Sequence, residues 1–176
     1  ESAVRPESLY GASKLSAEAF IMAFSGLYDI QAWICRLSNV VGERSTHGII
    51  LDLLKKLASN KEELEVLGDG TQTKPYMYVR EIVEAFMFIF ERADERLNVF
   101  NIGPRDATRV AQIAEMVLEA AGDGQRIAYT GGCRGWKGDV PVYRYRPSKL
   151  EALGWPKPMS STEAVRVAIA RTLETR

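Results

Sequence analysis

The sequence contains few of the residues that bind metals or form disulfides. Its 176 residues include two cysteines, Cys35 and Cys133, and a single histidine, His47. Two cysteines argue against a disulfide scaffold, and Cys35, inside an apolar segment, is expected to be a buried thiol. His47 has no potential ligand residues beside it, so we interpret it as a capping or surface residue and expect no metal site.

The chain also lacks an excess of charge and a long apolar run. Lys and Arg together number 23, and Asp and Glu together also number 23. This balance gives no sign of binding to nucleic acid or to an anionic membrane surface. No apolar stretch approaches the ~18–20 residues that a membrane span needs, and no signal peptide is visible. A reducing, cytoplasmic setting is therefore expected.

One helix carries a pair of residues that could transfer a proton. Apolar residues spaced by three and four predict a helix over about 8–27, with Gly26 as its stop signal. Tyr10 and Lys14 lie four residues apart and share a face of this helix. A tyrosine alone titrates near pH ~10, but a neighbouring ammonium favours the phenolate. Such a pair can take a proton from a sugar or alcohol hydroxyl while hydride leaves the same carbon.

The same spacing recurs at Tyr145 and Lys149, but there it carries no such meaning. Pro147 lies between these two residues, and proline belongs in the first turn of a helix rather than its interior. Tyr145 is therefore expected to lie outside the helix that carries Lys149, so the two side chains share no face.

The segment around Tyr10, PESLYGASKLSAE at 6–18, closely resembles the active-site segment of the extended short-chain dehydrogenase/reductase superfamily, the nucleotide-sugar epimerases and dehydratases. The resemblance implies NAD as cofactor and makes Tyr10 the catalytic acid/base. It implies that Lys14 holds the nicotinamide ribose and favours the ionised tyrosine, so both residues also contact the cofactor. In this family the helix helps to build the dimer interface, so a homodimer through this helix is implied.

The run IQAWICRLSNVV at 30–41 predicts a buried parallel strand, and ligands of doubly wound sheets sit off the carboxyl ends of such strands. Its end, RLSNVVGER, resembles the strand-end motif of the same family. That likeness implies that Asn39 contacts the substrate diphosphate and that Leu37 and Val40 lie near the nicotinamide. A turn residue that ends the strand is the alternative role for Asn39.

Two later segments also resemble this family. GDGTQTKPYMYVREIVEA at 68–85 has Lys74 where the family has an arginine that contacts the nucleotide diphosphate. Lysine keeps the charge of arginine but loses its bidentate fork. In RGWKGDV, beginning at Arg134, the likeness makes Arg134 a candidate phosphate contact and Asp139 a candidate ribose contact. Trp136 stands where many relatives carry an arginine.

A second glycine-rich stretch, TGGCRGWKG at 130–138, mimics a cofactor-binding fingerprint. A true fingerprint opens a helix, whereas residues 139–147 contain two prolines and alternate like extended chain. We therefore reject a cofactor site there.

Strands alternating with helices predict an α/β fold. We expect residues 1–45 to be the tail of a Rossmann-like doubly wound domain and residues 46–176 to be a small α/β substrate-binding domain. Helices are expected at about 47–59 with Thr46 as cap, 79–93, 108–121, 148–153 and 161–173, and short strands at 64–67 and 99–102. A dinucleotide-binding domain opens with a strand and a glycine-rich turn. Nothing of that kind precedes Tyr10, so the chain is expected to be a C-terminal portion.

The resemblance implies a parent enzyme that is an NAD-dependent nucleotide-sugar epimerase acting at C4 of a UDP-sugar through a keto intermediate. The isolated chain is expected to be inactive. A nucleotide-sugar dehydratase or reductase of the same superfamily is one alternative, and a cofactor-free nucleotide-sugar-binding module is another. The base, the sugar and the choice between NAD and NADP stay open.

Overall fold

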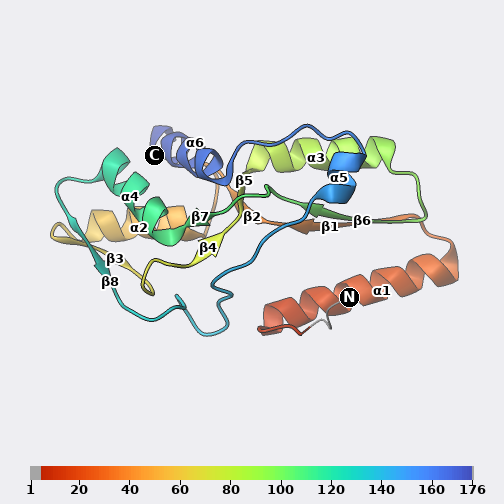
Figure 1. Ribbon diagram of the computed structural model, residues 1–176, viewed down its shortest axis with the longest axis horizontal. Helices are drawn as coiled ribbons and strands as arrows, with labels where there is room; N and C mark the ends of the chain where they lie inside the picture. Colours follow the sequence, from red (N-terminus) through yellow and green to blue (C-terminus); the bar gives the residue numbers. More distant parts are fainter. Residues whose placement is uncertain (1–4, 176) are drawn as a thin grey trace.

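The computed structural model describes residues 5–175, which form an elongated array of helices packed on short paired strands (Figure 1). The helices are α1 Leu9–Tyr28, α2 Ile49–Ser59, α3 Val79–Arg92, α4 Val110–Ala121, α5 Ser148–Ala152 and α6 Ser161–Glu174. The strands are β1 Ala32–Leu37, β2 Asn39–Val41, β3 Glu63–Val66, β4 Thr73–Lys74, β5 Tyr76–Tyr78, β6 Leu97–Ile102, β7 Thr108–Arg109 and β8 Arg126–Tyr129. The alternation of strands and helices confirms the expected α/β class.

The strands pair mainly in parallel. β1 pairs with β6, β2 with β5 and β3 with β8, all in parallel, whereas β4 and β7 are antiparallel. The strand expected over 30–41 is broken at Ser38 into β1 and β2. The break occurs because the amide of Ser38 donates to the carbonyl of Ile102, while the amide of Asn39 donates to that of Pro75. The chain thus changes its partner strand at the point where the predicted site residues lie.

Two apolar clusters form the core. One joins β2, β3 and β5 to α2, α4 and α6, with Leu64 and Ile113 fully buried. The other joins α3, β6 and α5, with Trp33 and Cys35 of β1 packed against it. β6, which comes from the 46–176 segment, therefore lies beside β1 from the 1–45 segment. The domain boundary at residue 45 stays a prediction.

α1 stands apart from both clusters. Ser8 caps it by accepting a hydrogen bond from the amide of Gly11 at 3.0 Å, as expected for an N-terminal serine. Gly26 is not its end, because the helix continues to Tyr28 and ends where Asp29 adopts a left-handed conformation with φ 54°. An aspartate tolerates that conformation.

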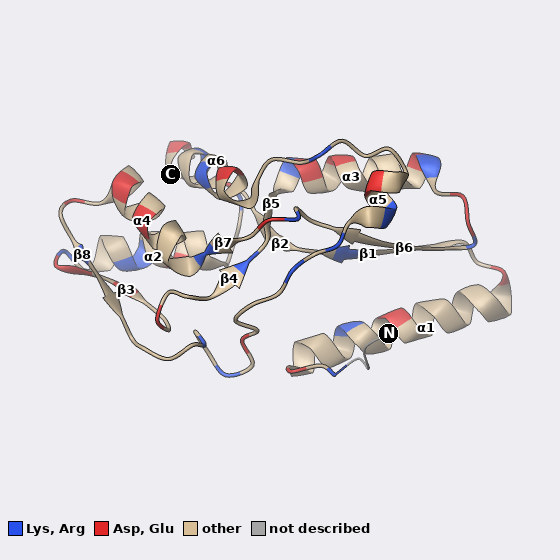
Figure 2. Ribbon diagram, viewed as in Figure 1, with Lys and Arg blue, Asp and Glu red and all other residues tan. Residues whose placement is uncertain are grey.

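Much of the apolar surface of α1 is exposed. Figure 2 shows no charged ribbon in its C-terminal half, and the residues there are apolar or small. Phe20, Phe24 and Leu27 are each more than half exposed. In contrast, α1 is tied to the rest of the chain by polar contacts, including a bidentate ion pair between Arg36 and Glu18.

Three local expectations differ from the structure. Thr46 does not cap the second helix, because α2 begins at Ile49 and its N-cap is Gly48, which has φ 116°. Thr108 lies in β7, and Arg109 is the cap of α4. The apolar pattern of the expected helix over 79–93 turns Ile82, Val83, Ala85, Phe86, Ile89 and Phe90 inward. In α3 Ile82, Ala85 and Ile89 are buried, but Val83, Phe86 and Phe90 are exposed.

Candidate active site

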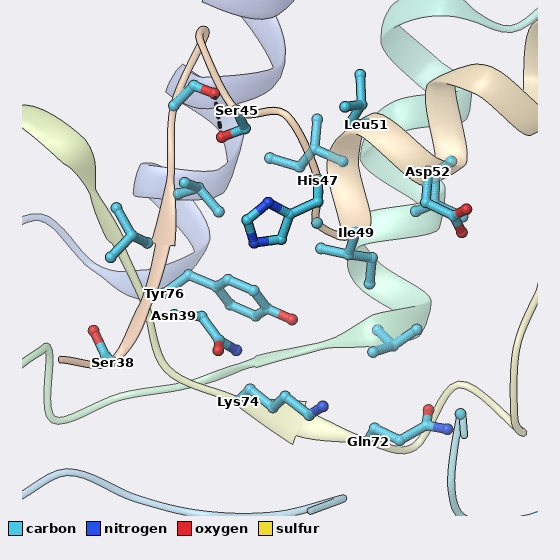
Figure 3. A pocket seen from close by; sticks show the side chains of 18 of the residues that line it. Ser38, Asn39, Ser45, His47, Ile49, Leu51, Asp52, Gln72, Lys74 and Tyr76 are labelled. Atoms are coloured by element: carbon cyan, nitrogen blue, oxygen red, sulfur yellow. Dashed lines mark hydrogen bonds between the residues drawn. The ribbon is translucent and has the colours of Figure 1, made fainter. Parts of the chain in front are cut away.

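A cavity of about 930 Å³ opens beside the break between β1 and β2. Its walls come from the ends of these strands, from β4 and β5, from the loop that leads into α2 and from the loop around residue 139 (Figure 3). Six of the eight predicted site residues line it: Tyr10, Leu37, Asn39, Val40, Lys74 and Asp139. The fold therefore brings together residues that are up to 129 positions apart, since 139 − 10 = 129.

Tyr10 and Lys14 lie side by side on α1, as their spacing predicts. The ammonium of Lys14 is 5.3 Å from the centre of the Tyr10 ring. Tyr10 lines the cavity and is 72% exposed, so its phenol is accessible to a ligand. Lys14 is outside the residues that line the cavity, and it reaches the site through Tyr10.

Lys74 and Asp139 form a buried ion pair. Lys74 is 8% exposed and Asp139 2% exposed, and the Lys74 ammonium donates to Oδ1 of Asp139. The other oxygen, Oδ2, accepts from the amide of Gly135 at 3.0 Å. The indole of Trp136 lies 4.6 Å from the Lys74 ammonium and covers it, a favourable cation–π arrangement. The two residues predicted to contact the nucleotide thus also hold each other in place.

Arg134 lies apart from the cavity lining. Its guanidinium forms an ion pair at 3.0 Å with the carboxylate of Glu7, which lies in the segment that precedes α1. The structure therefore gives Arg134 a protein partner, and its predicted phosphate contact stays a prediction.

Two tyrosines of the cavity had no role assigned from sequence. These are Tyr76 and Tyr143. Burial raises the pKa of Tyr76 well above its ordinary value, the nearby phenol of Tyr143 raises it further, and a hydrogen bond with Asn39 lowers it. Burial likewise raises the pKa of Tyr143. Both hydroxyls therefore remain protonated donors at neutral pH. The aromatic position that follows Lys74-Pro75 could have indicated Tyr76, but no sequence signal indicated Tyr143.

Two residues of the cavity lining carry a buried polar atom. Oε1 of Gln72, a residue that is 1% exposed, and Oγ of Ser38 have no hydrogen-bond partner within residues 5–175. Gly68 has φ 84°, and a Cβ there would lie 1.8 Å from Nε2 of Gln72. The first glycine of the 68–70 turn therefore makes room for the Gln72 side chain.

His47 also lines the cavity, at the entry to α2 (Figure 3). Its Nδ1 lies 3.2 Å from the hydroxyl of Thr46. Within the part of the chain that the structure describes, no three His, Cys, Asp or Glu residues gather in a way that could hold a metal ion.

The remaining expectations from sequence concern other parts of the chain. Tyr145 lies before α5 and shares no helical face with Lys149, as Pro147 predicts. The glycines at 131–138 are followed by extended chain and not by a helix, which confirms that this stretch does not have the context of a cofactor fingerprint. In the described residues no helix has both the length and the apolar character needed to cross a membrane.

Comparison with known proteins places these residues in a family context. The model of the NAD dependent epimerase/dehydratase family matches residues 1–103. A putative UDP-glucose 4-epimerase of Methanocaldococcus jannaschii is 28% identical over 167 residues, which cover 93% of this chain and 52% of the relative. The chain thus spans about half the length of the curated relatives that it matches over most of its own length.

Solved structures resemble the whole chain. The crystal structure of a UDP-galactose 4-epimerase matches 99% of this chain and 56% of its own, with 36% identity and a TM-score of 0.85. The structure of MoeE5 in complex with UDP-glucuronic acid and NAD matches 100% of this chain and 59% of its own, with 27% identity and a TM-score of 0.84. The likeness predicted from residues 6–18 is confirmed, and so is the Rossmann-like α/β architecture.

Proposed function

Because the chain belongs to the NAD dependent epimerase/dehydratase family, we propose that it is the C-terminal part of an NAD-dependent nucleotide-sugar epimerase. The proposed reaction inverts C4 of a UDP-sugar through a keto intermediate. The observation that carries the proposal is that Tyr10, Asn39, Lys74 and Asp139 line one cavity of about 930 Å³. That volume lies in the range of small-molecule and cofactor sites, roughly 300–1,000 Å³.

The residues near Tyr10 suit the nicotinamide end of NAD. Leu37 and Val40 line the cavity and present partly exposed apolar surface, 36% and 41%, close to the end of β1. The flat face of an aromatic ring can pack on such a surface, and Lys14 beside Tyr10 supplies hydrogen-bond donors for ribose hydroxyls. NAD, when bound, supplies the nicotinamide that accepts a hydride from the sugar and returns it.

Tyr10 is the proton-transfer group of this proposal. It takes the proton of the C4 hydroxyl while the C4–H bond breaks, which leaves a keto sugar in the cavity. After the keto sugar turns over, Tyr10 returns the proton to the C4 oxygen as hydride arrives on the opposite face. The Lys14 ammonium, 5.3 Å from the centre of the ring, is a positive charge beside the phenol that gives up and takes back its charge in these steps.

The nucleotide would be held by Asn39, Lys74 and Asp139. One of the three donors of the Lys74 ammonium is engaged with Asp139, so the others can contact a diphosphate oxygen. The second carboxylate oxygen of Asp139 accepts from Gly135 and keeps a lone pair for a ribose hydroxyl. Arg134 would supply a further phosphate contact after leaving Glu7.

The domain division at residue 45, a homodimer through α1 and a cytoplasmic location belong to the same proposal. The exposed apolar residues Phe20, Phe24 and Leu27 support burial of α1 against a second surface.

The function is tested with the whole protein that contains this chain. Incubation with NAD and UDP-glucose, followed by NMR of the anomeric protons, should show UDP-galactose, whereas loss of water from the sugar would indicate the dehydratase alternative. Tyr10→Phe should lower turnover by about 10²–10⁴-fold. Tyr28→Phe, an exposed tyrosine at the other end of the same helix, should stay within twofold of wild type. Turnover by Tyr10→Phe at the wild-type rate would refute the role of Tyr10, and binding of UDP-sugar without any need for NAD would favour the binding module.

A further inference from the structure

The residues 139–147, which we name the strap, run beside the cavity, and Asp139 and Tyr143 line it. At one end Asp139 pairs with Lys74. Val142 then forms a bridge to Thr73, and Tyr143 lines the cavity. At the other end the hydroxyl of Tyr145 donates a hydrogen bond to the carbonyl of Leu37, the last residue of β1. The strap therefore reaches from the Lys74–Asp139 pair to the end of β1, which lines the same cavity as Tyr10.

The ring of Tyr145 packs against Gly103 and Tyr143. A Cβ added to Gly103 would lie 3.2 Å from Cγ of Tyr145 and 2.7 Å from Cβ of Ser38, so the ring packs where only glycine leaves space. Tyr143 contacts the ring edge to face, with centroids 5.9 Å apart, a favourable aromatic geometry. Nδ2 of the Asn101 side chain donates to the backbone carbonyl of Arg146 at 3.3 Å and ties the residue after Tyr145 to β6.

The Tyr145 hydroxyl remains a hydrogen-bond donor at neutral and moderately alkaline pH. Burial raises the pKa of Tyr145 to about 12, and the Arg36 guanidinium acts in the opposite direction. A protonated phenol can donate to a carbonyl oxygen, whereas a phenolate cannot. The contact with Leu37 is therefore retained over the pH range in which a tyrosine general base would work.

Tyr145 also lies where α1 meets β1. Arg36, Glu18 and Tyr10 are close enough to act electrostatically on its phenol, and the Arg36–Glu18 ion pair is the bidentate contact between β1 and the middle of α1. Because α1 buries so little of its apolar surface in this chain, the position of Tyr10 relative to β1 depends on few contacts. Tyr145 lies beside Arg36 and Glu18, which make the bidentate contact between β1 and α1.

We propose that Tyr145 is a positioning residue that holds the Leu37 carbonyl, and with it the strand end carrying Leu37 and Asn39, in a fixed place relative to Tyr10. It touches neither substrate nor cofactor in this role. The inference rests on the proposed function for its catalytic consequence, but the anchoring itself is a property of this chain. A small displacement of a reacting group can lower a rate by about 10²-fold, so a lost anchor should be visible in kcat.

The anchoring is tested first on the chain itself, without substrate. Tyr145→Phe keeps the ring and removes the donor. Amide hydrogen exchange in a peptide covering residues 36–41 should become about fivefold faster, the usual effect of one lost hydrogen bond. Tyr129→Phe changes an exposed tyrosine of β8 that lies outside the cavity lining, and should leave that exchange unchanged. Equal exchange in wild type and Tyr145→Phe would overturn the inference.

The catalytic consequence is tested in the whole protein. Tyr145→Phe should lower kcat about 5–20-fold and change KM for the UDP-sugar by a smaller factor, since Lys74 and Asp139 keep their nucleotide contacts and only Asn39 lies on the released strand end. Tyr145→His restores a ring N–H donor and should recover part of the lost kcat. A kcat of Tyr145→Phe within twofold of wild type, or equal changes in kcat and KM, would overturn the positioning role. A wild-type protein without activity would instead count against the proposed function, while the exchange experiment still decides the anchor.

Discussion

The buried Lys74–Asp139 pair makes a stability prediction that can be worked from its geometry. Lys74→Met removes the cation and leaves the Asp139 carboxylate, 2% exposed, with the amide of Gly135 as its remaining hydrogen-bond donor among the described residues. Leaving one partner of a buried pair uncompensated typically costs about 3–5 kcal/mol. For a chain of this length each kcal/mol shifts the unfolding midpoint by about 2–4 °C. Lys74→Met should therefore lower the midpoint by about 6–20 °C.

Calorimetric unfolding at pH 7 measures this effect, and two further variants make it specific. The double change Lys74→Met with Asp139→Leu removes both charges and should recover most of the loss, because an apolar pair of similar size is often as stable as a buried ion pair. Arg105→Met breaks the exposed Arg105–Glu151 pair and should shift the midpoint by no more than about 2 °C. A midpoint for Lys74→Met within about 2 °C of wild type would refute the reasoning, as would a double variant no more stable than the single one.

Two further outcomes are expected. The isolated chain should bind NAD negligibly and catalyse nothing, because the glycine-rich turn that would hold the pyrophosphate is absent from residues 1–176. Micromolar binding in a calorimetric titration would contradict this and would make the glycines at 131–138 a candidate cofactor site again. The chain should also lose stability as the pH rises from about 10 to about 12. The reason is that burial raises the pKa of Tyr145 to about 12, above the ordinary value of ~10, so ionisation favours the unfolded chain in that window. Tyr145→Phe should lose less stability between pH 9 and pH 11.5 in denaturant titrations, and an equal loss in both proteins would refute the assignment.

Local chemistry explains what could be predicted along the chain. Periodicity located α3 and α6, because the residues that face the core repeat at helical spacing, and it located α1 as well, although the apolar residues of that helix are largely exposed. Pro147 was enough to exclude a shared face for Tyr145 and Lys149, since proline cannot occupy a helix interior. Caps were less predictable. Thr46 and Gly26 have the right chemistry, but α2 begins three residues after Thr46 and α1 ends two residues after Gly26.

The sequence by itself determined the candidate residues, since the type and order of Tyr10, Lys14, Asn39 and Lys74 carry the family likeness. It did not determine which of them meet. Only the tertiary structure joined Lys74 to Asp139 and Arg134 to Glu7, because these ion pairs span 65 and 127 positions, 139 − 74 and 134 − 7, and no local pattern records them. It also split the 30–41 strand at Ser38, where the chain exchanges one partner strand for another, and it brought the hydroxyl of Tyr145 to the Leu37 carbonyl. Spacing along a chain encodes which residues share an element, whereas the contacts between elements depend on packing that only the folded chain supplies.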